Sequence, residues 1–306
     1  MKKISVVFLA MVLATGMAMA QNSAVVSTTG SFNDATINQG LTNNTADILQ
    51  VQNGNSGYHA QATINQVAGD NWGKINQYNT RNYATVAENK NDRGQIYQDG
   101  SVNSSKIAFE YGKGANVGYV EQIGTYNGGY IYTTFNNNGT VADPLSIVQH
   151  GNTNNAVIEA GWNAPASTYD LASIIQLGDN NISKIRQEGG DRNIARVSQT
   201  GNLDVANLTQ TGGYLEAYIT QYNGDKNVVN LTQTGGIAHI TQGGDGNLVE
   251  GLKTGLVQDP LATFAGNTLD VMQLGTNNTL DLKSASFGAV VNVYQNGASN
   301  WSQVNN

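Results

Sequence analysis

Apolar and polar positions alternate with period two along much of this chain, most clearly over residues 181–242. A seven-residue phrase returns there: Asn or Asp, a small or branched residue two positions later, Ile, Val or Leu four later, and Gln six later. In one copy Asn193, Ala195, Val197 and Gln199 fall on one face of an extended strand. An amphipathic helix would need matches at i+3, i+4 and i+7, which the phrase lacks. The pattern therefore predicts short strands joined by Gly-rich turns.

The phrase can be followed from Asn33 to Asn306, so the chain is an array of repeats. We predict 23 strands, and the last inward position of each, here called the Gln slot, holds Gln in 16 of them, too often for chance. The predicted slots are Gln39, Gln50, Gln66, Gln77, Glu88, Gln98, Phe109, Gln122, Thr133, Gln149, Ala160, Gln176, Gln187, Gln199, Gln210, Gln221, Gln233, Gln242, Lys253, Gln273, Ser284, Gln295 and Asn306.

Two features bear on this strand assignment. Around residues 55–66 the strand could end at Gln61 or at Gln66, and we favour Gln66 because it places Ile64 in the core. Four gaps between slots are long, and three of them contain the prolines Pro144, Pro165 and Pro260. Proline cannot serve a central strand, so its absence from all the predicted strands supports the assignment.

The inward face of each strand has a polar residue at both ends, because the position six before the Gln slot, here called the Asn slot, is usually Asn or Asp. Buried amides are costly unless they are hydrogen-bonded. Identical amides stacked about 4.8 Å apart can each donate to one neighbour and accept from the other, as in cross-β structure. We predict a structural ladder that includes Asn33, Gln39, Asn44, Gln50, Asn71, Gln77, Asn181, Gln187, Asn193, Gln199, Gln210, Gln221, Asn227, Gln233, Gln242, Asn278 and Gln295.

The expected fold is all-β: a β-solenoid of about 11 two-strand coils, with two parallel sheets face to face and a cross-β core. Odd strands would form one sheet and even strands the other. The inward faces would meet over a thin core of Ala, Val, Ile and Leu.

The start of the chain has the features of a secretory signal peptide: lysines after Met1, an apolar run over residues 4–19, and a small-x-small ending at Ala20. We predict cleavage between Ala20 and Gln21. A membrane anchor is the weaker interpretation, because the run is short and Gly16 interrupts it. A mobile leader over residues 21–32 and a single solenoid domain over residues 33–306 would follow.

Composition narrows the function. The net charge is −7, and removal of Lys2 and Lys3 with the signal peptide makes it −9, which argues against nucleic-acid binding. The chain has no Cys, so an exported form would be held together without disulfides. No later segment is long and apolar enough to span a membrane. A disordered chain is disfavoured because Ile, Val and Leu recur at fixed offsets.

Residues Gln176 to Gln187 follow the pattern Gln-x-Gly-x-x-Asn-x-Ala-x-x-x-Gln, with Ser183 in place of Ala, and residues 273–278 and 295–300 carry its first half. This unit resembles the curlin repeat of curli fibre subunits, the bacterial functional amyloids, and the resemblance covers residues 33–306. It implies a β-solenoid, secretion through an outer-membrane pore, and polymerisation into extracellular fibres of the biofilm matrix. The chain departs from the familiar major subunit in having more than twice as many coils and long proline-bearing gaps, which leaves open whether it is a bulk or an accessory subunit.

Candidate chemistry is sparse. His59, His150 and His239 lack metal-ligand spacing. The segment from Gly243 to Asn247 resembles a calcium-binding solenoid turn but occurs once, so a plain turn is expected. No nucleophile–base set or paired carboxylates are evident. We expect no enzyme activity, no cofactor and no metal.

Two charged residues occupy predicted Gln slots: Glu88, stacked between Gln66 and Phe109, and Lys253, stacked between Gln233 and Ser284. They could be gatekeepers that interrupt a ladder and slow aggregation. An error in the local strand assignment or an outward rotation of the side chain explains them equally well.

Three functions remain open at this stage. The first is a subunit of extracellular curli-like fibres that assembles head to tail with itself and serves biofilm matrix, adhesion and surface colonisation. The second is a minor or nucleating subunit at the cell surface. The third is a monomeric β-solenoid adhesin or glycan-binding protein. The first is favoured because the array shows no capping helix after Asn300, so its open edges can template another copy. The expected partners are the chain itself, a second curlin-like subunit and an outer-membrane secretion pore.

Overall fold

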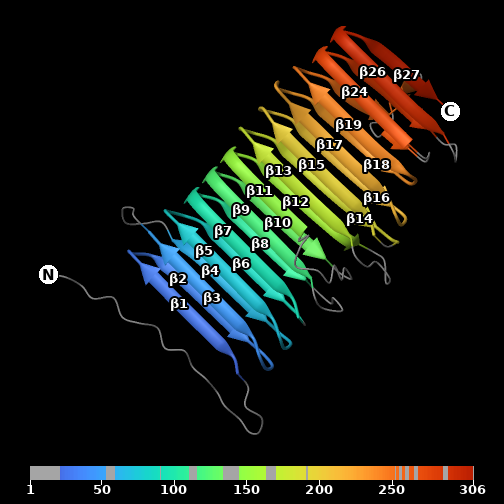
Figure 1. The fold of residues 1–306 in the computed structure, drawn as a ribbon. Helices are drawn as coiled ribbons and strands as arrows, with labels where there is room; N and C mark the ends of the chain where they lie inside the picture. Colours follow the sequence, from blue (N-terminus) through green and yellow to red (C-terminus); the bar gives the residue numbers. More distant parts are fainter. Residues whose placement is uncertain are drawn as a thin grey trace.

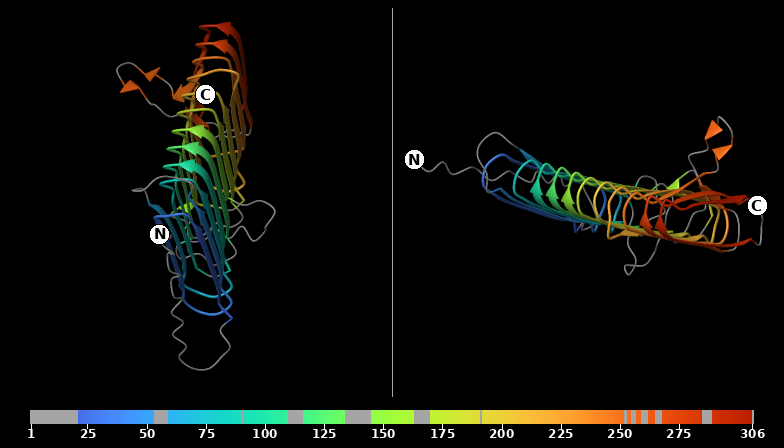
Figure 2. Two further views of the ribbon diagram at one scale, coloured as in Figure 1. Left: turned by 90° about the vertical axis from the view of Figure 1, so that its left-hand side faces the viewer. Right: turned by 90° about the horizontal axis from the view of Figure 1, so that it is seen from above.

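The computed structural model describes residues 21–52, 59–89, 91–109, 116–133, 145–162, 170–190, 192–251, 253–254, 257–258, 262–264, 268–284 and 289–305. Over these residues the chain contains strands and no helix, so no helix there could cross a membrane. The strands stack into an elongated, gently curved β-solenoid (Figures 1 and 2). The predicted signal peptide, including Ala20, and the three prolines lie outside the described residues.

Two parallel sheets face each other along the whole stack. Sheet A contains β1 (Ser23–Thr29), β3 (Thr45–Val51), β5 (Trp72–Tyr78), β7 (Arg93–Ser101), β9 (Val117–Thr125), β11 (Leu145–Asn152), β13 (Leu171–Leu177), β15 (Ile194–Thr200), β17 (Glu216–Tyr222), β19 (Ile237–Gly243), β24 (Thr268–Thr276) and β26 (Val290–Ala298). Sheet B contains β2 (Asn33–Gln39), β4 (Ala60–Gln66), β6 (Tyr83–Glu88), β8 (Ser104–Phe109), β10 (Gly128–Thr133), β12 (Asn155–Trp162), β14 (Ile182–Glu188), β16 (Val205–Thr211), β18 (Val228–Gln233), β20 (Leu248–Gly251), β23 (Ala262–Phe264), β25 (Thr279–Ser284) and β27 (Trp301–Asn305).

Alternate strands join alternate sheets, so the predicted β-solenoid with two parallel sheets is confirmed. Sheet A has 12 strands and sheet B has 13, close to the predicted count of about 11 coils. The ladder keeps register from coil to coil: Ile174 pairs with Val197 and Gln176 with Gln199. The favoured assignment at residues 55–66 is also confirmed, because β4 ends at Gln66 and Gln66 pairs with Gln39.

The core is the apolar layer between the sheets. Ile48, Ile75 and Ile96 occupy the same position on successive sheet A strands and are fully buried. Each stabilises the fold by about 1.5–3 kcal/mol through burial. The layer is thin because the inward positions alternate between these branched residues and small ones such as Ala46 and Ala195.

Many of the described turns between strands also stack from coil to coil. Gly178 adopts φ +118°, which disfavours L side chains, and a Cβ there would lie 2.1 Å from the main-chain oxygen of Gly201 in the next coil. Glycine is therefore required here both for its backbone conformation and for the close approach of neighbouring turns.

The stack begins one strand earlier than the repeat pattern indicates. Residues 21–32 were predicted to form a leader outside the array, but they contain β1, which pairs in parallel with β3 from Ser23↔Thr45 to Thr29↔Val51. The strand was missed because it has Thr28, not Gln, in its Gln slot. Its Asn22, Ala24 and Val26 do match the other inward positions, and these residues could have revealed it.

The segment around Lys253 also differs from the prediction. Lys253 belongs to β21 (Lys253–Thr254), which pairs antiparallel with β22 (Val257–Gln258) in a small hairpin separate from both sheets (Figure 2). The position expected for Lys253 is filled by Phe264 of β23, which pairs with Gln233 and Ser284. The gatekeeper role predicted for Lys253 therefore rested on an incorrect strand assignment. β20 ends before the Gln slot, and β23 completes this layer of sheet B in its place.

Candidate functional site

The Gln slots of sheet A form one continuous column of hydrogen bonds. In every step the Nε2 of one Gln donates to the Oε1 of the next at 2.7–2.9 Å. The column contains Gln50, Gln77, Gln98, Gln122, Gln149, Gln176, Gln199, Gln221, Gln242, Gln273 and Gln295, all of them buried. Each donor–acceptor pair leaves one amide proton for another partner.

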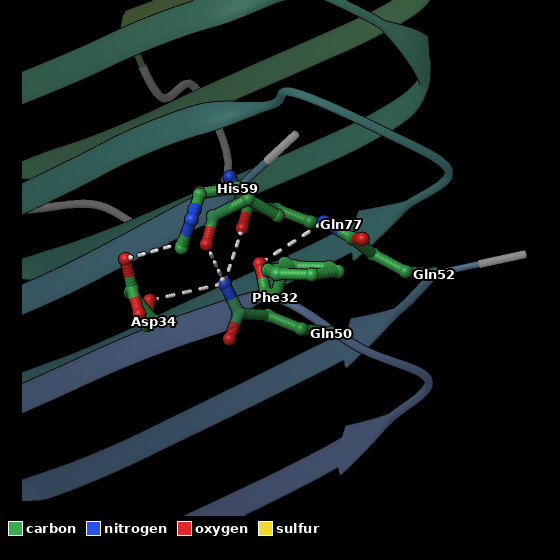
Figure 3. A network of polar contacts seen from close by, with 7 residues as sticks. Phe32, Asp34, Gln50, Gln52, His59 and Gln77 are labelled. Carbon is green, nitrogen blue, oxygen red and sulfur yellow. Dashed lines mark hydrogen bonds and ion pairs between the residues drawn. The ribbon is translucent and has the colours of Figure 1, made fainter. Parts of the chain in front are cut away.

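That second proton ties the column to the opposite sheet. Figure 3 shows Gln50, whose Nε2 reaches the Oε1 of Gln77 at 2.9 Å and the main-chain oxygens of Asp34 and Ala60 at 3.2 Å each. Gln77 likewise donates to the main-chain oxygen of Gln61 at 3.0 Å. Each of these amides therefore bonds both along its own sheet and across to the other sheet. Because buried amides are costly when unsatisfied, the column holds the two sheets together.

The corresponding column in sheet B is interrupted. Gln39 donates to Gln66 at 3.0 Å, and Gln66 donates to the carboxylate oxygen Oε2 of Glu88 at 2.7 Å. The next slots hold residues without an amide, namely Phe109, Thr133 and Ala160. The column resumes with Gln187, Gln210 and Gln233, joined at 3.0 Å per step.

The Asn slots are stacked too, by a main-chain bond that the sequence did not predict and, in part of the stack, by the predicted amide bond as well. The main-chain N–H of each residue donates to the side-chain Oδ1 of the residue one coil before it, as from Asn71 to Asn44 (3.1 Å) and from Asn227 to Asp204 (2.9 Å). The side-chain amide reaches a turn carbonyl in some coils, as from Asn181 to Gly201 at 2.9 Å. In others it stacks on the preceding side chain as predicted, as from Asn278 to Asn247 Oδ1 (3.0 Å) and from Asn300 to Asn278 Oδ1 (2.8 Å). The shorter Asn side chain sits at the turn, where main-chain groups lack ladder partners.

Other predicted Asn positions follow the same rule with one exception. Asn193 accepts from the main-chain N–H of Leu215 at 3.1 Å, and Asn278 accepts from that of Asn300 at 3.2 Å. Asn33 is not brought into an Asn stack, because its partner in β4 is Ala60. Its amide donates to the main-chain oxygen of Thr29 at 3.1 Å. Asn22, which the sequence prediction omitted, begins the sheet A stack by accepting from Asn44 N–H at 3.0 Å.

Glu88 points inward, in register with the Gln slots, so neither an incorrect strand assignment nor an outward rotation explains it. Its Oε1 accepts from the main-chain N–H of Gly94 at 2.6 Å, in addition to the bond from Gln66. Burial, with a smaller contribution from the charge of the nearby Asp92, raises the pKa of Glu88 to about 8 against the lowering effect of these two hydrogen bonds. Burial also raises the pKa of Asp92 to about 6.

Three glycines in sheet A make room for Glu88 and Phe109. Gly73, Gly94 and Gly118 are register partners at a position held by Ala46 one strand earlier. A Cβ on Gly94 would lie 2.5 Å from the Val86 side chain and 3.1 Å from Glu88 Oε1, and one on Gly118 would lie 2.8 Å from the Phe109 ring. The glycines of sheet A thus leave the space that Glu88 and Phe109 of sheet B fill.

The histidines lie on outer faces, each near an acidic side chain of a neighbouring strand or turn. His150 Nε2 lies 2.7 Å from Glu121 Oε1, His239 lies 3.0 Å from Asp270, and His59 lies 3.2 Å from Asp34 (Figure 3). Among the described residues, no group of three or more His, Cys, Asp or Glu is placed to hold a metal ion.

Comparison with known families supports the repeat assignment. Residues 205–235 match the family model described as the curlin associated repeat. In the structure this segment runs from the start of β16 through β17 and β18, one and a half coils of the solenoid. Among curated proteins, no sequence matches the chain. The chain therefore carries a curlin associated repeat, and the repeat and the β-solenoid together fit a curlin-like structural protein.

Proposed function

We propose that this chain is a structural subunit of extracellular curli-like amyloid fibres that assembles head to tail and serves biofilm matrix and adhesion. The observation that carries the proposal is that the first and last strands of each sheet have their inward residues in the same register as the rest of the stack. Within the described residues, β1 and β26 each pair on one side only, and so do β2 and β27. Such edges are templates for another strand.

The N-terminal layer presents its inward residues to solvent. Val26 is the register partner of the buried Ile48, yet it is 50% exposed. At the other end, Val293 of β26 is partly buried against the core and Gln295 closes the sheet A column. Stacking β1 of one copy on β26 of another would cover Val26 and place Thr28 next to Gln295. Apolar burial at about 25 cal/mol per Å² would favour that contact.

The contact is heterologous, since two different surfaces meet, and a stack with no closing rotation grows into a filament. Parallel strands spaced about 4.8 Å apart along its axis would continue from subunit to subunit. Export by a signal peptide through an outer-membrane pore, and co-assembly with a second curlin-like subunit, complete the proposed function.

A nucleating role at the cell surface is the second candidate. The interruption of the sheet B column from Glu88 to Ala160 favours it, because a less uniform stack is suited to starting a fibre of another subunit. A nucleator would accelerate assembly of that other subunit at low molar ratio. A bulk subunit would accelerate only its own.

Adjacent valines provide a matched test. Val25 and Val26 are equally exposed, at 52% and 50%, but only Val26 lies on the inward face that stacking would bury. Val26→Lys should strongly slow fibre formation, because it would bury a charge at the junction, whereas Val25→Lys should leave it unchanged. Fibres are followed by amyloid-dye fluorescence and electron microscopy of the freshly purified chain.

The outcomes separate the candidates. Equal assembly of the two variants would contradict the proposed junction. A wild-type chain that stays monomeric for days and binds no dye would refute the fibre function itself and would favour a monomeric adhesin.

A further inference from the structure

A groove of about 700 Å³ lies at one edge of sheet A, crossing β3, β5, β7 and β9 and the turns that precede them. Its lining is aromatic and polar: Asn43, Thr45, Asp70, Asn71, Trp72, Arg93, Gln95, Val117, Gly118 and Tyr119. None of these residues belongs to the terminal strands β1, β26 or β27, so the groove is independent of the proposed fibre junction.

The glycine column beneath the groove explains its position. Gly73, Gly94 and Gly118 bring β5, β7 and β9 closer to sheet B than alanine would permit, since Cβ atoms there would lie 2.5–2.9 Å from side-chain atoms of Ile64, Val86 and Phe109. Most of the lining comes from the outer faces of these same strands, and Gly118 of the glycine column also lines the groove. The hollow is therefore built into the backbone and does not depend on side-chain rotamers alone.

Two aromatic rings mark the groove. Trp72 is 36% exposed. Tyr119 lies two strands further along the stack and two residues further along the strand, because Trp72 pairs with Arg93, Arg93 with Val117, and Gln95 with Tyr119. Two strand spacings combined with two residues of strand rise put the two positions about 12 Å apart on a diagonal across the sheet, roughly the length of two sugar units in an extended chain. The Tyr119 ring is held in place, because its hydroxyl donates to Glu121 and Glu121 in turn binds His150.

Polar groups beside the rings are available to a ligand. Within the described part of the chain, the guanidinium of Arg93, the amide of Gln95 and the indole N–H of Trp72 take part in no hydrogen bond or ion pair. Across the groove, the Asn43 amide donates to Asp70 at 3.1 Å. The lining contains one cation, Arg93, and one carboxylate, Asp70, so their charges balance.

We propose that this groove binds an extended chain of neutral, β-linked sugars. Sugar rings have apolar C–H faces that pack on aromatic rings and equatorial hydroxyls that pair with planar amide and guanidinium groups. A nucleic acid is disfavoured by the net charge of −7 and the single cation of the lining. A groove that crosses four successive strands of one sheet favours an extended chain over a coiled one.

The test is isothermal titration calorimetry of the freshly purified full chain with cellohexaose and chitohexaose, which are β-linked, and maltohexaose, which is α-linked and coiled. We expect at least one β-linked probe to bind at a single site. Trp72→Ala should weaken it at least about tenfold, and Trp72→Phe should keep most of the affinity because it keeps a ring. The matched control is Tyr83→Ala, which removes an aromatic ring 41% exposed on the outer face of β6 in sheet B and should leave binding unchanged.

Circular dichroism of each variant verifies that the fold is intact. The proposal is overturned if neither β-linked probe binds at millimolar concentration, if maltohexaose binds as well as they do, or if Trp72→Ala and Tyr83→Ala behave alike. None of these outcomes bears on fibre assembly, which the lysine variants of Val25 and Val26 test separately.

Discussion

Replacing Glu88 by Gln should remove most of the dependence of folding stability on pH between about pH 6 and 8. Glu88 is 3% exposed and receives hydrogen bonds from Gln66 and the main chain of Gly94. Its pKa rises from 4.5 to about 8, mainly through burial. Since one pKa unit corresponds to about 1.4 kcal/mol, deprotonation of the folded chain should cost roughly 5 kcal/mol of unfolding free energy.

The direction follows from linkage. The pKa of Glu88 is higher in the folded chain than in the unfolded chain, so the unfolded chain loses the proton first as pH rises. This contribution to stability is fully present below pH 4.5 and is lost as pH rises to about 8. Asp92 and Asp204, whose pKa values burial raises to about 6, remain in the variant. They retain a loss of stability in the same direction, between about pH 4 and 6.

The assay is equilibrium urea unfolding of the freshly refolded monomer, followed by circular dichroism at pH 5 and pH 9. At pH 5 Glu88→Gln should equal the wild type or be about 1 kcal/mol less stable, because its amide nitrogen cannot accept the bond from Gly94. At pH 9 the variant should be more stable by several kcal/mol. Glu216→Gln, on the outer face of β17, is the control and should change neither value. A Glu88→Gln effect that is the same at both pH values would refute the reasoning.

Two further substitutions test the sheet-to-sheet fit and the ladder. Gly94→Ala should destabilise the fold by about 1–3 kcal/mol, because its Cβ would lie 2.5 Å from Val86 Cγ1. The control Gly128→Ala, whose Cβ would have no atom closer than 4.0 Å, should cost less than about 1 kcal/mol. Equal melting temperatures of the two variants would contradict the tight contact at Gly94. Gln122→Leu should cost about 2–5 kcal/mol in urea unfolding, because it removes the acceptor of Gln98 (2.8 Å) and Ser105 (2.6 Å). Gln61→Leu on the exposed face of β4 should be near neutral, and a neutral Gln122→Leu would show that the sheet A column contributes little.

Much of this fold can be predicted from the sequence because its information is local and repeated. Each strand carries its own inward pattern, and stacking identical units leaves one self-consistent register, so Gln176 pairs with Gln199 as the spacing predicts. Prediction failed where the pattern lost its marker residue. β1 has Thr28 where Gln was expected, and the layer near Lys253 is completed by Phe264, brought in after an excursion of the chain.

The ladder could be predicted only in part, because the sequence of one repeat does not show which residues of the opposite sheet it contacts. The pattern identifies Gln50 and Gln77 as stacked amides, but it cannot show that their second protons reach the other sheet. It also cannot pair Glu88 with Gly94, since that contact joins opposite sheets. The groove beside Trp72 was missed for the same reason: its lining comes from four strands and from the turns that precede them.

Cryo-electron microscopy of fibres grown from the purified chain tests most directly whether the solenoid is a unit of polymerisation. We predict that both sheets continue across the subunit junction, with β1 of one copy stacked in parallel on β26 of the next at about 4.8 Å and Thr28 in line with Gln295. Fibres whose strands are not in register across the junction, or a chain that forms no fibres at all, would contradict this arrangement.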